Sequence, residues 1–300
     1  MNGNIKPMKF LRSFPHILAI VALATTAWTS PSLGNEINSI PDDTQYLQEE
    51  PIDIYVPPPE TGTPGTCAAL IEPAINKIIG RYQNNWGILA ETLEGGTTLY
   101  SHNPDKFFIP ASNTKLFTTA AALQRLNPQG KIGSKSVQNW INVTNINSNN
   151  YYADTLLKHI GGASVAKSIL AQIGVDPNSF RLADGSGLSR KNAATPRALV
   201  TTLRSMHYAP GNNVFYASLP VAGISGTLRN RMKNTTAQGT VYAKTGTLRG
   251  VRALSGYMNH PYFGQVIFSI LANNPSVSGS ALVSSIDQIV LQISRTKPCN

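Results

Sequence analysis

The sequence predicts an α+β fold, in which one antiparallel sheet of about five strands is flanked by helices and carries an all-helical lobe. Two β-rich runs lie near residue 90, and three more lie between residues 239 and 272. The residues between these two groups show the apolar spacing of helices. The sheet is therefore expected to be assembled from both ends of the folded chain, with the helical lobe inserted between them.

The first half of the folded chain is expected to contain a helix, a β-hairpin and a second helix. They are placed at Cys67–Gly80, at Trp86–Leu93 with Thr97–Ser101, and at Ala111–Leu123. A glycine ends the first helix, and Glu94-Gly95-Gly96 supplies turn residues for the hairpin. Residues 127–150 follow as a polar stretch that is rich in Asn, Ser and Gly.

The second half is expected to contain three helices, three strands and a closing helix. They are placed at two helices within 151–174 divided at Gly161-Gly162, a helix from Pro196 to Met206, strands at Gly239–Thr247, Val251–Met258 and Gln265–Ala272, and a helix at Val277–Arg295. Proline suits the first turn of a helix, where its missing N–H has no partner to lose. The closing helix is amphipathic, which suits packing on the sheet.

The first 34 residues have the pattern of a secretory signal peptide. Three basic residues precede an apolar run, Phe14–Trp28, that ends near small residues, with cleavage expected near Ala27 or after Gly34. The run has fifteen residues, fewer than the roughly 20 that span a bilayer. No transmembrane helix is therefore expected in the mature chain, and an uncleaved N-terminal anchor is the alternative.

Residues 35–66 differ in composition from the folded domain, residues 67–300. They contain seven acidic residues, no Lys or Arg, and a Pro-rich end, which predicts an extended linker. The domain has 22 Lys and Arg against 8 Asp and Glu, a net charge of +14. Such a charge suits an anionic polymer or membrane surface outside the cytoplasm. No nucleic-acid-binding motif accompanies it, and the export signal argues against that partner.

The two cysteines, Cys67 and Cys299, bracket the folded domain almost end to end. Domain termini often lie close together, and an exported chain meets an oxidising compartment. We therefore expect a disulfide that joins the two ends of the domain, with a pair of free thiols as the alternative.

The stretch Ala111–Leu123 contains the first candidate catalytic pair. Ser112 and Lys115 stand three residues apart, so a helix places them on one face, one turn apart. A serine hydroxyl becomes a good nucleophile when a neighbouring base removes its proton. A lysine can be that base if burial or nearby positive charge lowers its pKa. Taken alone, the S-x-x-K pattern is common.

Two further short motifs follow the S-x-x-K pattern in the chain, and the three in this order are a much stronger indication of function than S-x-x-K alone. Ser148-Asn149-Asn150 lies in a loop before a helix, where a hydroxyl and a carboxamide can project into a cleft. Lys244-Thr245-Gly246 lies near the end of a strand, where lysine and threonine offer donors to a carboxylate and glycine lets a substrate backbone approach. The three motifs together are those of β-lactamases and penicillin-binding proteins.

With these motifs, the chain resembles the serine D-Ala-D-Ala carboxypeptidases among the low-molecular-mass penicillin-binding proteins, a class that also cleaves peptide crosslinks. The likeness extends from about residue 86 to 290. Besides Ala111–Lys115 it includes the blocks SNNYYADTLLKHIG (148–161), ADGSGLSRKN (183–192), LPVAGISGTL (219–228) and AKTGTLRGVRALSGY (243–257). The resemblance implies a β-lactamase/transpeptidase-like fold, peptidoglycan stem peptides as substrates, β-lactams as inhibitors, no cofactor, and a place in the bacterial periplasm or cell envelope.

The resemblance also implies a role for each motif residue. Ser112 is the nucleophile, Lys115 takes its proton, and Ser148 relays a proton to the leaving amine. Substrate-binding roles fall to Asn150, Lys244, Thr245 and Gly246, and the backbone N–H groups of Ser112 and Thr247 form the oxyanion hole. A neighbouring Lys244 is expected to help keep Lys115 neutral.

One departure from the family concerns the spacing of the first two motifs. Members of the class usually carry a long insertion of extra domains between them, whereas Ser112 and Ser148 are here 36 residues apart. The chain is therefore interpreted as a minimal catalytic core. This leaves open whether it cleaves crosslinks as well as free peptide tails. A non-catalytic wall- or penicillin-binding module with the same fold remains an alternative.

Other classes of enzyme fit the sequence less well. A serine β-lactamase shares the fold and motifs, but one large class needs a glutamate after the second motif, and residues 150–230 contain none. A Ser-His-Asp hydrolase lacks a G-x-S-x-G elbow, and no His, Cys or Asp cluster has the spacing of metal ligands. In the DGSGLSR block, a turn held by Asp184 is favoured over substrate contacts from Ser186, Ser189 and Arg190.

Overall fold

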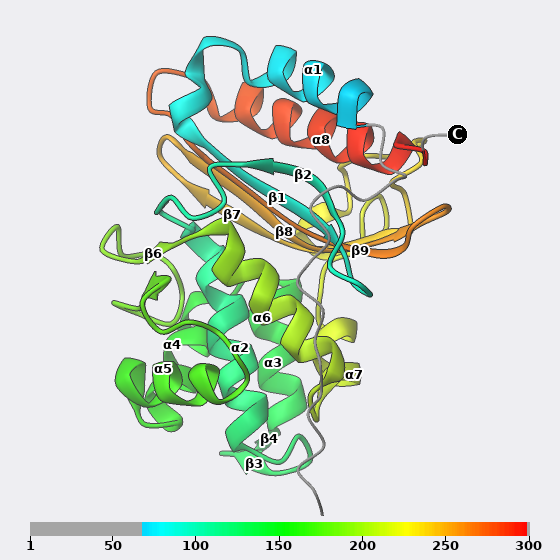
Figure 1. Cartoon of the computed structure of the whole chain (residues 1–300). Coiled ribbons are helices and arrows are strands. Elements are labelled where there is room, and N and C mark those ends of the chain that lie inside the picture. The colour runs from blue at the N-terminus through cyan, green and yellow to red at the C-terminus, as the bar shows by residue number, and fades with distance from the viewer. Residues whose placement is uncertain (1–67, 299–300) are drawn as a thin grey trace, which may run out of the picture. The chain divides into compact units, whose positions relative to one another are not determined.

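The computed structural model describes residues 68–298 (Figure 1). Its central sheet has five antiparallel strands in the order β2-β1-β9-β8-β7. The strands of this sheet are β1 (Trp86–Thr92), β2 (Thr98–His102), β7 (Val241–Leu248), β8 (Val251–His260) and β9 (Gly264–Asn273). Two short pairs lie outside it, β3 (Lys131–Ile132) with β4 (Lys135–Ser136) and β5 (Phe180–Arg181) with β6 (Ala193–Ala194).

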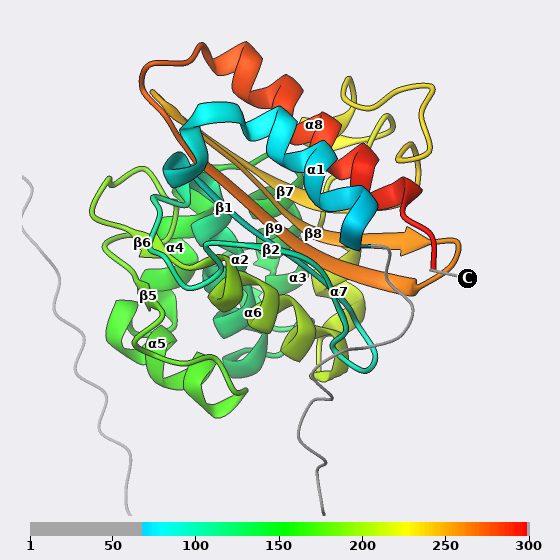
Figure 2. The ribbon, with the colours of Figure 1, turned by 45° about the horizontal axis from the view of Figure 1, so that its top comes forward.

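The helices of the described residues lie on both faces of this sheet. They are α1 (Ala68–Ile79), α2 (Thr114–Arg125), α3 (Val137–Ile146), α4 (Asn150–His159), α5 (Gly162–Gln172), α6 (Pro196–Tyr208), α7 (Asn212–Ala217) and α8 (Gly279–Arg295). α1 and α8 lie side by side on one face, and α2 to α7 form a lobe on the other (Figure 1 and Figure 2). The predicted α+β class, with a sheet built from both ends of the domain and an inserted helical lobe, is confirmed.

The alternation of side chains along the strands separates two apolar cores. In β1, Ile88 and Ala90 belong to the core beneath α1 and α8, whereas Leu89 belongs to the core shared with the lobe. Successive side chains of a strand point to opposite faces, so one strand serves both cores. β1 pairs with β9 from Trp86 opposite Ala272 onward, which joins the start of the domain to its end.

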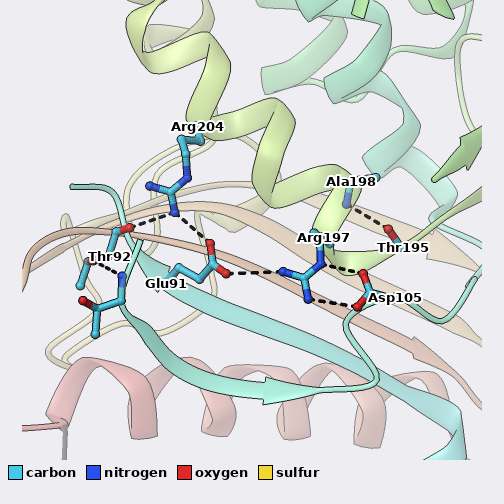
Figure 3. A network of polar contacts seen from close by, with 8 residues as sticks. Glu91, Thr92, Asp105, Thr195, Arg197, Ala198 and Arg204 are labelled. Carbon is cyan, nitrogen blue, oxygen red and sulfur yellow. Dashed lines mark hydrogen bonds and ion pairs between the residues drawn. The ribbon is translucent and has the colours of Figure 1, made fainter. Parts of the chain in front are cut away.

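Helix α6 is fixed to the sheet by a polar network as well as by apolar packing (Figure 3). Arg204 donates to Glu91 Oε2 at 2.9 Å and to the carbonyl oxygen of Thr92 at 3.0 Å. Arg197, at the exposed start of the helix, pairs with Asp105 at 2.6 Å. The network therefore connects α6 to β1 and to the loop that follows β2.

Helices α3 and α7 are not predicted from the sequence. Residues 127–150 are expected to be only a polar stretch, yet α3 occupies part of them, with Ser136 capping its N-terminus through a bond from Asn139 N. Trp140 and Ile141 bury the inner face of α3 against the lobe. Tertiary packing of these two side chains outweighs the low helix propensity of the surrounding Asn residues.

Several expectations concern residues outside the described range. The signal peptide, the acidic linker, and the Cys67 and Cys299 pair all fall there, so they remain predictions. Among the described helices, none has both the length and the apolar character needed to span a bilayer.

Candidate active site

Ser112 lies in a 3₁₀ turn directly before α2. Ala111, the residue before it, has a φ of +48°, a conformation that L residues adopt rarely and that often marks functional sites. The buried Asn113 side chain ties this turn to the sheet, since its Nδ2 donates to the Lys244 carbonyl at 2.7 Å and its Oδ1 accepts from Ser255 Oγ at 2.7 Å. The turn is therefore held in a fixed position against β7.

Lys115 has a fully buried side chain one helical turn after Ser112. Its Nζ lies 3.0 Å from Ser112 Oγ, 2.8 Å from Asn150 Oδ1 and 2.5 Å from the Ser186 carbonyl oxygen. The last two atoms can only accept hydrogen bonds. In a neutral amine the two N–H groups therefore bind these two oxygens, and the lone pair faces the serine hydroxyl. This is the arrangement that a general base for Ser112 requires.

The pKa values of the two motif lysines are lowered mainly by burial. Burial lowers the pKa of Lys115 from 10.5 to about 8, while the carboxylates of Asp154 and Asp184 act in the opposite direction. Burial also lowers the pKa of Lys244 well below its usual value, and the positive charge of Lys115 adds to this effect. Burial, one of the two causes expected from the sequence, is therefore the main cause that favours the neutral form of Lys115.

The Ser186 carbonyl belongs to the DGSGLSR block, which forms a loop over α2. The carboxylate of Asp184 holds this loop by accepting from Gly187 N at 2.7 Å and from Ser189 N at 2.6 Å. Gly187 has a φ of +84°, and a Cβ there would lie 1.9 Å from the Ala111 carbonyl oxygen. The loop therefore packs its backbone directly on the turn that carries the nucleophile, as only glycine permits.

The second motif places Ser148 and Asn150 at the N-terminus of α4. Asn149 caps this helix by accepting from Tyr152 N, and Asn150 is its first residue. Ser148 has a φ of +54°, which turns the chain so that its Oγ lies 2.8 Å from Lys244 Nζ. Asn150 contacts Lys115 instead. The motif thus bridges the two lysines of the site.

The third motif lies on β7 and contributes to the site in two different ways. Thr245 Oγ1 donates to Thr227 Oγ1 at 2.7 Å, so two hydroxyls lie together at the cleft. Gly246 is buried, and a Cβ there would lie 2.7 Å from the Pro110 carbonyl oxygen. The geometry therefore gives Gly246 a packing reason, close contact with the turn before Ser112, and the approach of a substrate backbone stays a prediction. Thr247 lines the cleft.

These groups surround a cleft with a volume of about 390 Å³. Its lining combines the motif residues with side chains from the DGSGLSR loop, from residues 227–231 and from α8, namely Ser112, Ser148, Asn150, Gly187, Leu188, Thr227, Arg231, Thr245, Thr247, Leu248 and Val283. Of the catalytic and substrate-binding residues expected from the sequence, Ser112, Ser148, Asn150, Thr245 and Thr247 line this cleft, whereas Lys115, Lys244 and Gly246 are buried. Among residues 68–298, no group of three or more potential metal ligands is found.

Sequence reasoning missed three contributors to the site. Thr227 lies within a block that carries the family resemblance, but no spacing rule points to its hydroxyl. The role of Asn113 depends on a buried bond to the Lys244 carbonyl, 131 residues away in sequence. Ser186 contributes a backbone carbonyl, which no side-chain motif can reveal.

The chain belongs to the D-Ala-D-Ala carboxypeptidase 3 (S13) family, whose model matches residues 71–147 and 131–296. The two matched segments overlap at residues 131–147, between Ser112 and Ser148, where the resemblance indicates that an insertion is missing. Two curated relatives illustrate the likeness. The chain is 33% identical over 181 residues to the penicillin-sensitive carboxypeptidase A of Dictyostelium discoideum, covering 54% of this chain and 35% of the relative. It is 41% identical over 162 residues to a D-alanyl-D-alanine carboxypeptidase of Actinomadura sp. (strain R39), covering 49% and 30%.

The chain therefore spans about a third of the length of these relatives. Solved structures show the same fold at low sequence identity. Penicillin-binding protein 4 of Haemophilus influenzae matches with a TM-score of 0.64 at 14% identity, covering 75% of this chain and 99% of that one. A β-lactamase of Chitinophaga pinensis matches with a TM-score of 0.65 at 17% identity, covering 75% and 98%. The fold alone thus does not separate peptidases from β-lactamases.

Proposed function

We propose that the protein is an exported serine D-Ala-D-Ala carboxypeptidase that acts on peptidoglycan stem peptides in the bacterial cell envelope and is acylated by β-lactams. The observation that carries this proposal is the geometry of Lys115, whose buried amine has two fixed acceptors and Ser112 Oγ within 3.0 Å. Family membership and the activities for which the two relatives are named support the substrate class.

In the proposed acylation step, Lys115 takes the proton of Ser112 as Oγ attacks the carbonyl carbon between two D-alanines. The backbone N–H groups of Ser112 and Thr247 stabilise the oxyanion, and each such donor typically contributes roughly 100- to 1000-fold in rate. The C–N bond then breaks, Ser148 relays the proton that Lys115 took to the leaving amine, and the acyl group remains on Ser112 as an ester. Water attacks this ester, which releases the shortened peptide and restores the serine.

Substrate recognition is assigned to the groups around the proton-transfer centre. Lys244 and Thr245 bind the terminal carboxylate of the peptide or of a β-lactam, because a lysine Nζ and a hydroxyl can both donate hydrogen bonds to an anion. The adjoining Thr227 hydroxyl extends this donor set. Asn150 holds the amide of the substrate through its carboxamide.

The β-lactamase alternative needs a group that activates the deacylating water. One large class uses a glutamate after the second motif, and residues 150–230 contain none. The carboxylates of Asp154 and Asp184, whose charges act on Lys115, already accept hydrogen bonds from the backbone. Asp154 accepts from Gly185 N at 2.9 Å, and Asp184 holds the DGSGLSR loop. This arrangement favours a long-lived acyl-enzyme with penicillin over rapid hydrolysis.

The first test is the intact mass of the protein, and of a Ser112→Ala variant, after incubation with a penicillin. A stable mass increase on the wild-type protein alone is expected. Rapid drug hydrolysis without an adduct would support the β-lactamase instead. Neither adduct nor hydrolysis would support the non-catalytic binding module.

The second test is D-alanine release from a synthetic pentapeptide ending in D-Ala-D-Ala, compared with cleavage of a crosslinked peptide dimer. Release of D-alanine by the wild-type protein, and none by Ser112→Ala, is expected. An acylated protein that releases no D-alanine would limit the proposal to penicillin binding. Cleavage of the dimer would extend the proposal to endopeptidase activity.

A further inference from the structure

The carbonyl that binds Lys115 is held in place by two side chains outside the three motifs. Asp154 Oδ1 accepts from Gly185 N at 2.9 Å, and Thr118 Oγ1 donates to the Gly185 carbonyl at 2.8 Å. The backbone N–H and carbonyl groups of Gly185 are therefore both held by hydrogen bonds, the first by a side chain of α4 and the second by a side chain of α2. We call this pair of bonds the Gly185 clamp. The next carbonyl along the chain, that of Ser186, is the one that accepts from Lys115 Nζ.

The clamp is tight because the backbone of the loop lies directly on α4. A Cβ at Gly185 would lie 2.6 Å from the Ala153 carbonyl oxygen and 2.8 Å from Leu157 Cβ. Asp154 is one helical turn after Asn150, which is the other acceptor of Lys115, so both side chains lie on the same face of α4. One helix thus controls two of the three atoms around the amine, one directly and one through the loop.

We propose that Asp154 is a positioning residue for the acylation step: it fixes the Ser186 carbonyl against Lys115 so that the lone pair of the amine faces Ser112, and its charge stabilises the protonated lysine. This inference rests on the proposed function, because it assigns Lys115 as the base. It gives Asp154 a role in orienting the base, although Asp154 lies outside the three motifs.

The titratable groups that interact with Lys115 come from three elements. Asp154 lies on α4, Asp184 lies in the DGSGLSR loop, and Lys244 lies on β7. The two carboxylates raise the pKa of Lys115 against the effect of burial. A base is active when neutral, so acylation increases as the pH rises through about 8, the pKa of Lys115. Removing the charge of Asp154 lowers this pKa and moves the midpoint of the pH profile to lower pH.

The test compares two substitutions that separate the charge from the clamp. Asp154→Asn removes the charge but keeps an oxygen that can accept from Gly185 N. Thr118→Val removes the donor to the Gly185 carbonyl without changing any charge. The measurement is the second-order rate constant of Ser112 acylation by a fluorescent penicillin between pH 5.5 and 10. Asp176→Asn is the matched control, because Asp176 also accepts a backbone N–H in a turn but is exposed and belongs to no catalytic contact.

For Asp154→Asn, the rate at pH 6.5 relative to the plateau of the same variant is expected to rise about threefold, since loss of the negative charge lowers the pKa of Lys115 and increases its neutral fraction at that pH. For Thr118→Val, the plateau is expected to fall about tenfold with an unchanged midpoint, because a loosened carbonyl misdirects the lone pair. Asp176→Asn is expected to match the wild-type profile.

An unchanged midpoint in a folded Asp154→Asn protein, or a Thr118→Val plateau within twofold of wild type, would overturn the inference. Thermal unfolding of each variant establishes that it is folded. If Asp154→Asn does not fold, Thr118→Val still tests the clamp from its other side. Failure of the wild-type protein to be acylated would instead remove the proposed function, and this inference with it.

Discussion

The two faces of the five-stranded sheet differ in what they bury. Beneath α1 and α8 the core is an apolar cluster that includes Ile75, Ile286 and Ile289, all fully buried. On the lobe face, the apolar core is interrupted by fully buried polar side chains, among them Lys115 and Lys244. Burying an amine costs free energy unless hydrogen bonds compensate. The comparison indicates that one face serves mainly stability, whereas the other gives up some stability to hold the catalytic groups.

The largest expected effect is on the lobe face, at the proposed base. Lys115→Met removes the group that accepts the serine proton, and general base catalysis typically contributes roughly 100- to 10,000-fold in rate. We expect acylation by fluorescent penicillin to fall about 1000-fold in a protein that remains folded. The exposed Lys158→Met on α4 is the control and is expected to react as wild type does. Residual acylation within tenfold of wild type would rule out Lys115 as the base.

The next largest effect is expected from Gly187→Ala, which tests whether acylation depends on close backbone packing on the lobe face. In Gly187→Ala the new Cβ would lie 1.9 Å from the Ala111 carbonyl oxygen at a φ of +84°. Movement of about 1 Å at a reacting group can cost roughly 100-fold in rate, so we expect a loss of that size in acylation. The control is Gly133→Ala, where φ is +62° but nothing lies within 4 Å. This variant is expected to lose about 1 kcal/mol of stability and to keep the wild-type acylation rate. Equal kinetics for the two variants would contradict the packing argument.

A substitution on the opposite face is expected to separate stability from catalysis. Ile289→Ala creates a cavity beneath α8 and should lower the free energy of unfolding by about 3 kcal/mol, measured by urea denaturation. The acylation rate of the folded protein at 20 °C, chosen well below unfolding, is expected to stay within twofold. The neighbouring exposed Gln288→Ala is the control, with an expected change within about 0.5 kcal/mol. A loss of acylation rate in folded Ile289→Ala would show that the two faces are coupled.

The smallest expected effects lie in the network that joins α6 to the sheet (Figure 3). The side chains of Arg197 and Asp105 are 49% and 67% exposed, and such ion pairs contribute less than about 1 kcal/mol. Arg204 is more buried and binds Glu91 as well as two backbone carbonyls. Urea denaturation of Arg197→Gln is expected to show a change below about 1 kcal/mol, and that of Arg204→Gln about 2 kcal/mol. The reverse order would contradict this assignment.

The sequence predicts the sheet and most helices because each has a local signal. Strand runs are bounded by turn residues, Gly161-Gly162 separates α4 from α5, and Thr195 caps α6 ahead of a proline. Helix α3 is not predicted because its Asn-rich segment has low helix propensity. The helix is instead stabilised by burial of Trp140. Such a tertiary effect leaves no local pattern in the sequence.

The candidate site shows the same division between local and long-range information. Ser112 and Lys115 are found by their spacing on a helix, and the other two motifs by their order along the chain. The positive φ of Ala111 and of Ser148 has no sequence signal, because neither residue type favours that conformation. The Gly185 clamp likewise depends on two elements that pack from different parts of the chain.

The pairing of β1 with β9 has a consequence for the order of events during synthesis. Trp86 lies opposite Ala272, so the middle of the sheet is completed only after the strand that contains Ala272, 186 residues further along the chain, has been made. Contacts between such distant segments form slowly. Lys244, whose backbone carbonyl anchors the nucleophile turn by accepting from Asn113, is also synthesised late, 131 residues after Asn113. If the proposed function holds, a nascent chain that carries Ser112 but not yet Lys244 is expected to be unreactive toward penicillin, because its nucleophile turn lacks this anchor.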